Sequence, residues 1–184
     1  MTIQISMPLL FLVGVLTFGC NTDGKNTERE DSDVLVSETF IDAFYSFDQD
    51  SLKALLTKAD QSAESILFYQ GWAEGGNYEV RQRHGCYTSG DSTITCPVTV
   101  KDDLIQALEL DLFVTDTFHL TVVDGSILAI ETSSNDPPLF YEARKWVAEN
   151  RPELTNEACS DDNGTPGDCV RGVVQGFREF MAAR

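Results

Sequence analysis

The spacing of apolar residues changes twice along the chain, and these changes divide it into helical and extended parts. From residue 34 to residue 75 the apolar positions recur at helical spacing. A first helix is predicted from near Val34, and Asp48-Gln49-Asp50 interrupts the pattern. Two shorter helices are predicted after it, at residues 51–58 and 65–73.

Alternation of apolar and polar residues replaces the helical spacing after Asn77, which indicates strands that bury one face. Asp124-Gly125 within this stretch is typical of a two-residue hairpin turn. Asn135-Asp136-Pro137-Pro138 ends the sheet, and helical spacing returns at residues 139–150 and 170–183. Helices, then strands, then helices are an order that indicates the α+β class, with an antiparallel sheet.

An apolar run at residues 7–19 gives residues 1–19 the features of a signal peptide. The run has about the length of a signal-peptide core and is too short to span a bilayer. Its end, Gly19-Cys20, resembles the bacterial lipoprotein signal, in which a small residue precedes an invariant cysteine. That resemblance implies cleavage before Cys20 and a diacylglycerol on its thiol. An ordinary signal peptide and a true membrane anchor are the alternatives.

The residues after the cleavage site are expected to connect the lipid to the folded part. Asn21 to Asp33 is polar and lacks large apolar residues, so residues 20–33 are predicted to be a flexible tether. By resemblance to lipoproteins of Gram-negative bacteria, Asn21 in place of aspartate implies the outer rather than the inner membrane. The expected location is therefore the cell envelope, with secretion as the alternative.

Four cysteines remain after Cys20, an even number that suits two disulfides in an oxidising compartment. Four cysteines allow three pairings, and local geometry favours Cys86 with Cys96 and Cys159 with Cys169. Each of these pairs encloses a short segment rich in turn-forming residues, which brings its two ends together.

No metal or cofactor is expected from the other polar residues. Neither cysteine pair has the two-residue spacing of a zinc knuckle, and His84 and His119 are not spaced as ligands. The acidic loop at residues 161–168 places oxygen-bearing side chains beside a glycine, which leaves calcium binding open. The alternative is a solvated loop closed by a disulfide.

The charge of the chain limits its partners. Its 13 Lys and Arg residues stand against 30 Asp and Glu residues, for a formal net charge of −17 at pH 7. Such a chain repels the phosphates of nucleic acids and offers no basic patch to anionic lipids. The membrane is therefore expected to be a partner only through the lipid on Cys20.

Three motifs follow one another in the predicted sheet: Cys86…Cys96-Pro97-Val98-Thr99-Val100, then Asp103-Leu104…Ala107-Leu108, then Phe118…Val122-Val123-Asp124-Gly125-Ser126-Ile127. This pattern resembles the nuclear transport factor 2-like superfamily, and within it the SnoaL-like proteins of unknown function. The resemblance covers residues 34–134 and implies a cystatin-like cone, a curved antiparallel sheet wrapped around the first helices. It also implies an apolar pocket inside the cone and a homodimer. Residues 135–184 are expected to form a helical extension with a disulfide loop.

The resemblance places candidate pocket residues on the first helices and on the predicted strand at 113–123. These candidates are Phe44, Tyr45, Tyr69, Trp72, Phe118 and Leu120. Core packing is the alternative role for all of them.

Catalysis would require an ionisable side chain inside the cone, and the candidates are His119 and Asp103. By alternation, His119 faces away from the apolar residues on either side of it, which favours a structural or surface role. Asp102 and Asp103 are adjacent, so their side chains do not face each other, and helix capping is the alternative. The directions of Asp116 and Glu131 stay open at this point.

These observations predict a membrane-anchored envelope lipoprotein whose folded domain binds a small apolar ligand or a protein partner without catalysis. The alternative is a SnoaL-like isomerase, cyclase or hydrolase that acts on a hydrophobic small molecule. An ionisable side chain that points into an open cavity would favour the second function.

Overall fold

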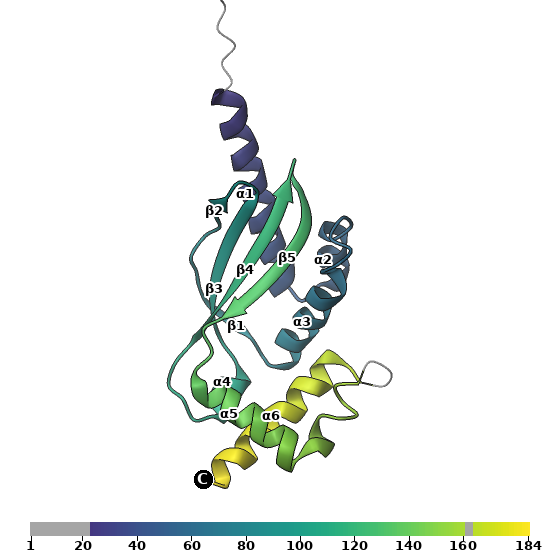
Figure 1. The fold of residues 1–184 in the computed structure, drawn as a ribbon, viewed down its shortest axis with the longest axis vertical. Helices are drawn as coiled ribbons and strands as arrows, with labels where there is room; N and C mark the ends of the chain where they lie inside the picture. The colour runs from purple at the N-terminus through teal and green to yellow at the C-terminus, as the bar shows by residue number, and fades with distance from the viewer. Residues whose placement is uncertain (1–22, 161–163) are drawn as a thin grey trace, which may run out of the picture.

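The computed structural model describes residues 23–160 and 164–184, and within them the fold is α+β, as predicted (Figure 1). The first helices are α1 (Asp23–Tyr45), α2 (Gln49–Leu55) and α3 (Ala63–Gly75). The strands are β1 (Glu79–Arg83), β2 (Tyr87–Gly90), β3 (Thr93–Lys101), β4 (Val114–Val123) and β5 (Ser126–Ser134), with the short helix α4 (Asp103–Ala107) between β3 and β4. The chain continues with α5 (Pro138–Asn150), the 3-10 turn η1 (Pro152–Leu154) and α6 (Pro166–Ala182).

The strands form one antiparallel sheet in the order β1-β3-β4-β5, and β2 pairs with the same edge of β3 as β1. A disulfide between Cys86 and Cys96 joins the link between β1 and β2 to the middle of β3. This bond confirms the first predicted pairing. Asp124 at φ 50° and Gly125 at φ 68° connect β4 to β5, which confirms the predicted hairpin.

Helix α1 lies along one face of the sheet and supplies the centre of the core (Figure 1). Buried and partly exposed residues alternate along β4, so one face of this strand points toward α1. Phe40 and Phe44 of α1 and Phe118 of β4 are fully buried, and the ring centroids of Phe44 and Phe118 are 4.9 Å apart. Contacts between rings of this kind add to the free energy gained by burial.

Helix α1 begins at Asp23, well before the predicted start near Val34. The prediction of a tether over residues 20–33 is therefore corrected for residues 23–33, which are helical. Residues 1–22, which include the predicted signal peptide and Cys20, lie outside the described residues. Among the helices that the structure describes, none combines the length and the apolar character needed to cross a bilayer.

Polar contacts with the β4–β5 turn hold this early part of α1. Asp33 is 8% exposed and accepts a hydrogen bond from the backbone N of Gly125 at 2.8 Å. The guanidinium of Arg29 lies 3.3 Å from the carboxylate of Asp124 in the same turn. These contacts fix residues 29–33 of α1 to the β4–β5 turn, although residues 23–33 have no apolar face to bury.

The C-terminal helices form a second layer at one end of the sheet, against α3 and α4 (Figure 1). Phe140 of α5 and Phe177 of α6 meet with ring centroids 5.3 Å apart. A second disulfide joins Cys159 to Cys169 at the start of α6, which confirms the other predicted pairing. The buried side chains of this layer belong to the same cluster as those beneath the sheet, so the extension shares the core of the domain.

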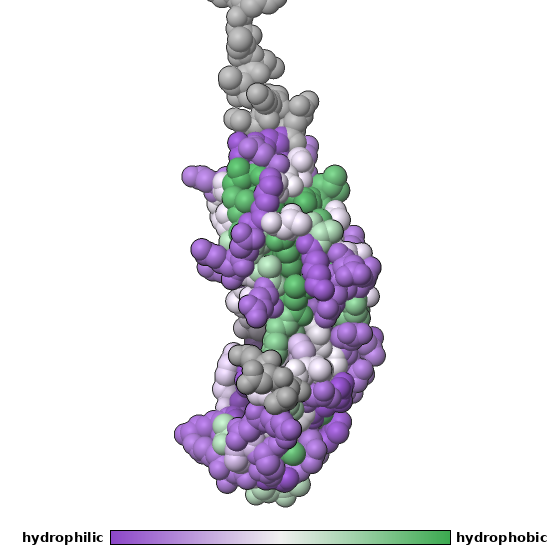
Figure 2. Space-filling model, turned by 90° about the vertical axis from the view of Figure 1, so that its right-hand side faces the viewer, coloured by the Kyte–Doolittle hydropathy of each residue, from purple (hydrophilic) through white to green (hydrophobic). Residues whose placement is uncertain are grey.

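The outer edge of β5 is partly covered by the segment that joins α2 to α3. The backbone N of Ile130 donates a hydrogen bond to Ser62 Oγ at 3.1 Å, and Lys58 Nζ lies 3.0 Å from Ser126 Oγ. Because the backbone N–H of Ile130 is already bonded, the edge of β5 is less able to pair with another strand. Figure 2 shows the side of the molecule that carries α2 and α3, where hydrophobic side chains form a strip between hydrophilic flanks.

Candidate functional site

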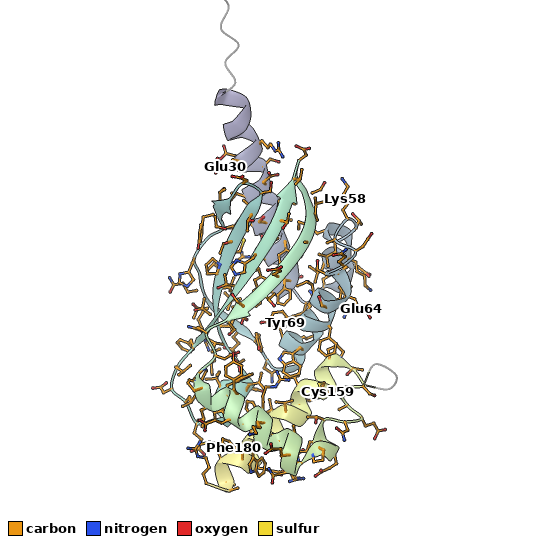
Figure 3. All side chains as sticks on the ribbon, viewed as in Figure 1. Glu30, Lys58, Glu64, Tyr69, Cys159 and Phe180 are labelled. Atoms are coloured by element: carbon orange, nitrogen blue, oxygen red, sulfur yellow. A yellow bond between two sulfur atoms is a disulfide. The ribbon has the colours of Figure 1, made fainter. Side chains whose placement is uncertain are left out.

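A cavity of ≈ 620 Å³ opens between α3, α5 and the end of the β4–β5 hairpin that lies opposite its turn. Figure 3 labels Tyr69 of α3 in this part of the molecule, between the lower end of the sheet and the C-terminal helices. Six of its twelve lining residues are aromatic: Phe68, Tyr69, Trp72, Tyr78, Phe140 and Tyr141. Its polar lining residues are Asp116, Thr132, Ser133, Ser134, Asp136 and Arg144.

Helix α3 and the turn after it position the first four rings. Phe68, Tyr69 and Trp72 share one side of α3 because residues three and four apart are neighbours on a helix. Asn77, at φ 53°, reverses the chain after the helix. The turn brings Tyr78 back beside Tyr69, with the two ring centroids 6.4 Å apart.

The sheet and α5 position the polar groups. Alternation along β4 puts Asp116 on the same inner face as Phe118, and Asp116 pairs in register with Ser134 of β5. Pro138 occupies the first turn of α5, where a proline is tolerated because no helical N–H is needed there. The next turn of α5 brings Arg144 to the opening of the cavity.

Asp116 is the buried carboxyl of the site, with only 3% of its surface exposed. The hydroxyl of Tyr45 donates a long hydrogen bond to its Oδ2 at 3.5 Å. Burial raises the pKa of Asp116 to about 7, and the charges of Asp136 and Asp102 add to this rise, whereas hydrogen bonding with Tyr69 and Ser134 opposes it. The group therefore exchanges a proton near neutral pH.

Two of the three tyrosines around Asp116, Tyr45 and Tyr69, donate hydrogen bonds to its carboxylate. Burial, and then the neighbouring Asp116 charge, raise the pKa values of Tyr45, Tyr69 and Tyr78 well above their ordinary value. All three hydroxyls therefore keep their protons at physiological pH. They can stabilise an oxygen or a carboxylate that lies within the cavity.

Asp136 and Arg144 bring opposite charges to the opening. Burial raises the pKa of Asp136, and hydrogen bonding with Ser134 and the charge of Arg144 oppose the rise. The guanidinium carbon of Arg144 lies 6.0 Å from the ring centroid of Trp72, within range of a cation–π contact. Ser134 thus interacts with both Asp116 and Asp136 and links the interior of the cavity to its opening.

A second cavity of ≈ 450 Å³ adjoins the first and shares Phe68, Trp72 and Arg144 with it. Val147 of α5, Val173 of α6 and the Cys159–Cys169 disulfide line its other parts. The shared side chains therefore form the boundary between an aromatic, acidic chamber and a more aliphatic one.

The sequence-based pocket candidates divide into two groups. Tyr69 and Trp72 line the cavity, and Tyr45 reaches it through its hydrogen bond to Asp116. Phe44, Phe118 and Leu120 are fully buried in the core and are not among the lining residues. For these three, the alternative role of core packing applies.

Neither catalytic candidate lies in the cavity. His119 is on the outer face of the sheet, as alternation predicted, where its Nδ1 is 3.3 Å from Thr95 Oγ1 and its Nε2 is 3.1 Å from Ser133 Oγ. Asp103 is half-buried outside the cavity and accepts a hydrogen bond from Asn77 Nδ2 at 2.6 Å. The capping role belongs to Asp102, which accepts a hydrogen bond from the backbone N of Ile105 at 2.9 Å.

Sequence reasoning missed ten of the twelve lining residues, and four of these matter most for the chemistry of the site, namely Asp116, Tyr78, Asp136 and Arg144. The spacing of Asp116 from Phe118 was a usable signal, because residues two apart on a strand share a face. No comparable signal marks the other three, since the packing of the C-terminal layer and the turn after α3 determine their positions.

In the part of the chain that the structure describes, no three His, Cys, Asp or Glu side chains are grouped so that they could hold a metal ion. Residues 161–163 of the acidic loop lie outside the described residues, so the calcium alternative for that loop stays a hypothesis. Comparisons with protein-family models, with curated proteins and with solved structures found no match to this chain.

Proposed function

We propose that the protein is an envelope lipoprotein whose domain, an NTF2-like cone, binds a small and largely apolar molecule. The observation that carries this proposal is the ≈ 620 Å³ cavity with six aromatic side chains and one buried carboxyl, Asp116. A concave site with mainly apolar walls and a few convergent polar groups is the usual form of a small-molecule site, and its volume is in the common range.

The NTF2-like assignment is supported by the element order and by the position of α1 along one face of the sheet. The lipoprotein assignment is supported by the apolar run at residues 7–19 and by Gly19-Cys20. In the bound complex the rings would supply contact area, and Asp116 with the tyrosine hydroxyls would orient one polar group of the ligand.

Binding is tested with a neutral, environment-sensitive dye such as Nile red. Phe68→Ala and Tyr141→Ala remove wall residues that are 42% and 57% exposed, so neither change should prevent folding. We expect each to weaken dye binding by about tenfold, because each removes buried apolar contact with the ligand. Phe113→Ala, which removes a ring that is 53% exposed outside the cavity, is the matched control. Dye binding that is absent, or equal in all four proteins, would rule out the proposed site.

The lipid is tested by labelling producing cells with radioactive palmitate. Label should enter the protein and should be lost in the variant Cys20→Ser, since the thiol is the proposed point of attachment. Equal labelling of the two proteins, or none in either, would contradict the lipoprotein assignment and would leave the binding proposal unaffected.

A second candidate function is proton transfer, as in an isomerase, cyclase or hydrolase that acts on a hydrophobic molecule. The observation that favours it is Asp116, because a general acid or base works best with a pKa near the operating pH, and here the pKa is about 7. Mass spectrometry of a molecule recovered with the protein, before and after incubation with fresh protein, separates the two functions. An unchanged molecule excludes catalysis on it, whereas conversion that Asp116→Asn abolishes supports it.

A further inference from the structure

The charges around the aromatic cavity do not balance. Asp116 and Asp136 line it, and a third buried carboxyl, Asp102, lies close enough to interact with Asp116. Arg144 is the one basic residue among the lining residues. The cavity therefore holds more acidic than basic groups, inside a chain whose net charge is already −17.

The state of Arg144 is unusual for this protein. Among the described residues, six of the eight arginines have a carboxylate oxygen within 4.0 Å: Arg29, Arg81, Arg83, Arg151, Arg171 and Arg184. Arg144 has none there and instead lies over the ring of Trp72. Among the described residues, neither Asp116 nor Asp136 has a basic group within 4.0 Å, and Arg144, the one basic residue in the cavity wall, is not paired with either of them.

The aromatic walls suit a positive charge. The face of an aromatic ring carries partial negative charge, so rings around a cavity attract a cation that has lost part of its water. Trp72 already makes this kind of contact with Arg144 at the opening. Tyr69 and Tyr78 also line the cavity, and Tyr69 hydrogen-bonds with Asp116, so a cation in the interior would lie among aromatic rings and near a carboxylate.

We propose that the ligand of this cavity is an organic cation, an amine or quaternary ammonium whose apolar part contacts the rings and whose charge faces Asp116 and Asp136. This inference rests on the binding function proposed above and specifies its ligand class. An anionic ligand that fills the cavity is disfavoured because its charge would lie beside the carboxyls of Asp116 and Asp136. A neutral ligand would leave the charge imbalance in place.

Three compounds with one carbon skeleton test the sign of the charge: phenethylamine as the cation, 2-phenylethanol as the neutral form and phenylacetate as the anion. Their affinities for the intact protein are measured at pH 8 by NMR titration. We expect phenethylamine to bind at least about tenfold more tightly than 2-phenylethanol, with phenylacetate weakest. One hydrogen bond between the ammonium and a carboxylate contributes about that factor to the affinity.

Variants then locate the preference. Asp116→Asn and Asp136→Asn should each bring the affinity for phenethylamine close to that for 2-phenylethanol, while the affinity for the alcohol stays within about twofold. Glu131→Gln removes one negative charge from the exposed outer face of β5 and should leave the ratio unchanged. Arg144→Gln should tighten the binding of phenethylamine, because it removes the competing positive charge.

The pH dependence adds an independent readout. The groups that face Asp116 are Tyr45 from α1, Tyr69 from α3, Tyr78, Asp102 at the start of α4, Asp136, and Arg144 from α5. Only the carboxyls change charge between pH 5 and pH 8, so phenethylamine should bind more weakly at pH 5 and 2-phenylethanol equally at both.

The outcomes separate the two proposals. If the alcohol binds as tightly as the amine and Phe68→Ala weakens both, the cavity is a ligand site but the cation inference is wrong. If phenylacetate binds most tightly and Arg144→Gln abolishes its binding, the ligand class is anionic and the inference is likewise wrong. If none of the three binds, the inference fails, and the Nile red experiment decides separately whether the cavity binds a ligand.

Discussion

Position 116 carries a carboxyl group on a strand face that is otherwise apolar. The neighbouring inner-face residues of β4 are Val114, Phe118, Leu120 and Val122, all buried. A charged group placed among them loses most of its hydration, and its hydrogen bonds with Tyr45, Tyr69 and Ser134 replace only part of it. Such a position is costly for stability, and perturbed carboxyls of this kind are typical of functional sites.

The titration of Asp116 can be followed directly. We expect its side-chain carbon to titrate in ¹³C NMR with a midpoint near 7, as its pKa of about 7 requires. In Tyr69→Phe the midpoint should move upward, because the lost hydroxyl stabilises the charged carboxylate. Tyr141→Phe, at the exposed edge of the cavity, is the control and should leave the midpoint unchanged. A midpoint near 4 in the parent protein would show that Asp116 is well solvated or paired.

At the scale of helices and strands, the elements formed by local contacts were predicted correctly, and those that depend on long-range contacts were not. The β4–β5 hairpin and the outward direction of His119 follow from alternation and turn chemistry, which are local properties. The two disulfides follow from short loops of turn formers. The helical state of residues 29–33 could not be predicted in this way, because polar contacts join Arg29 and Asp33 to a turn far along the chain.

The residues of the candidate site also differ in whether they could be predicted from the sequence. Tyr69 and Trp72 were expected in the pocket because the family resemblance places pocket residues on the first helices. Arg144 and Asp136 enter the site only because α5 folds back against α3, which no local pattern specifies. An aromatic pocket was therefore predictable, whereas the charges that give it chemical character depended on long-range packing.

The contact between Asp33 and the β4–β5 turn gives a test at this scale. Asp33→Ala leaves the backbone N of Gly125 without its side-chain acceptor, and we expect a loss of about 1–2 kcal/mol in the free energy of unfolding. Urea denaturation measures the loss, and hydrogen exchange of the Gly125 amide should become faster. Asp33→Asn keeps an acceptor oxygen and should recover most of the stability. If Glu30→Ala, one turn of helix away and exposed, destabilises the protein as much, the Asp33 contact is not the cause.

For the whole molecule, the acidic groups of the site make stability depend on pH in a definite direction. The pKa of Asp116 rises from 3.8 to about 7 and that of Asp102 from 3.8 to about 6, both chiefly through burial. Between these limits the folded chain binds more protons than the unfolded chain, so the free energy of unfolding falls as pH rises. The net charge of −17 acts in the same direction, since protonation also reduces repulsion among surface acids.

We therefore expect the protein to be more stable at pH 5 than at pH 8, by a few kcal/mol, because each pKa unit corresponds to about 1.4 kcal/mol. Urea unfolding at half-unit steps from pH 4.5 to pH 8.5 measures the curve. Asp116→Asn removes the largest of these shifted groups, so it should be more stable than the parent protein at pH 8, and the difference should shrink toward pH 5. Asp60→Asn, which changes an exposed aspartate between α2 and α3, should follow the parent curve. If the stability of the parent protein instead rises steadily from pH 5 to pH 8, other groups of the folded protein must stabilise the ionised carboxylate of Asp116. The burial argument for the site would then fail.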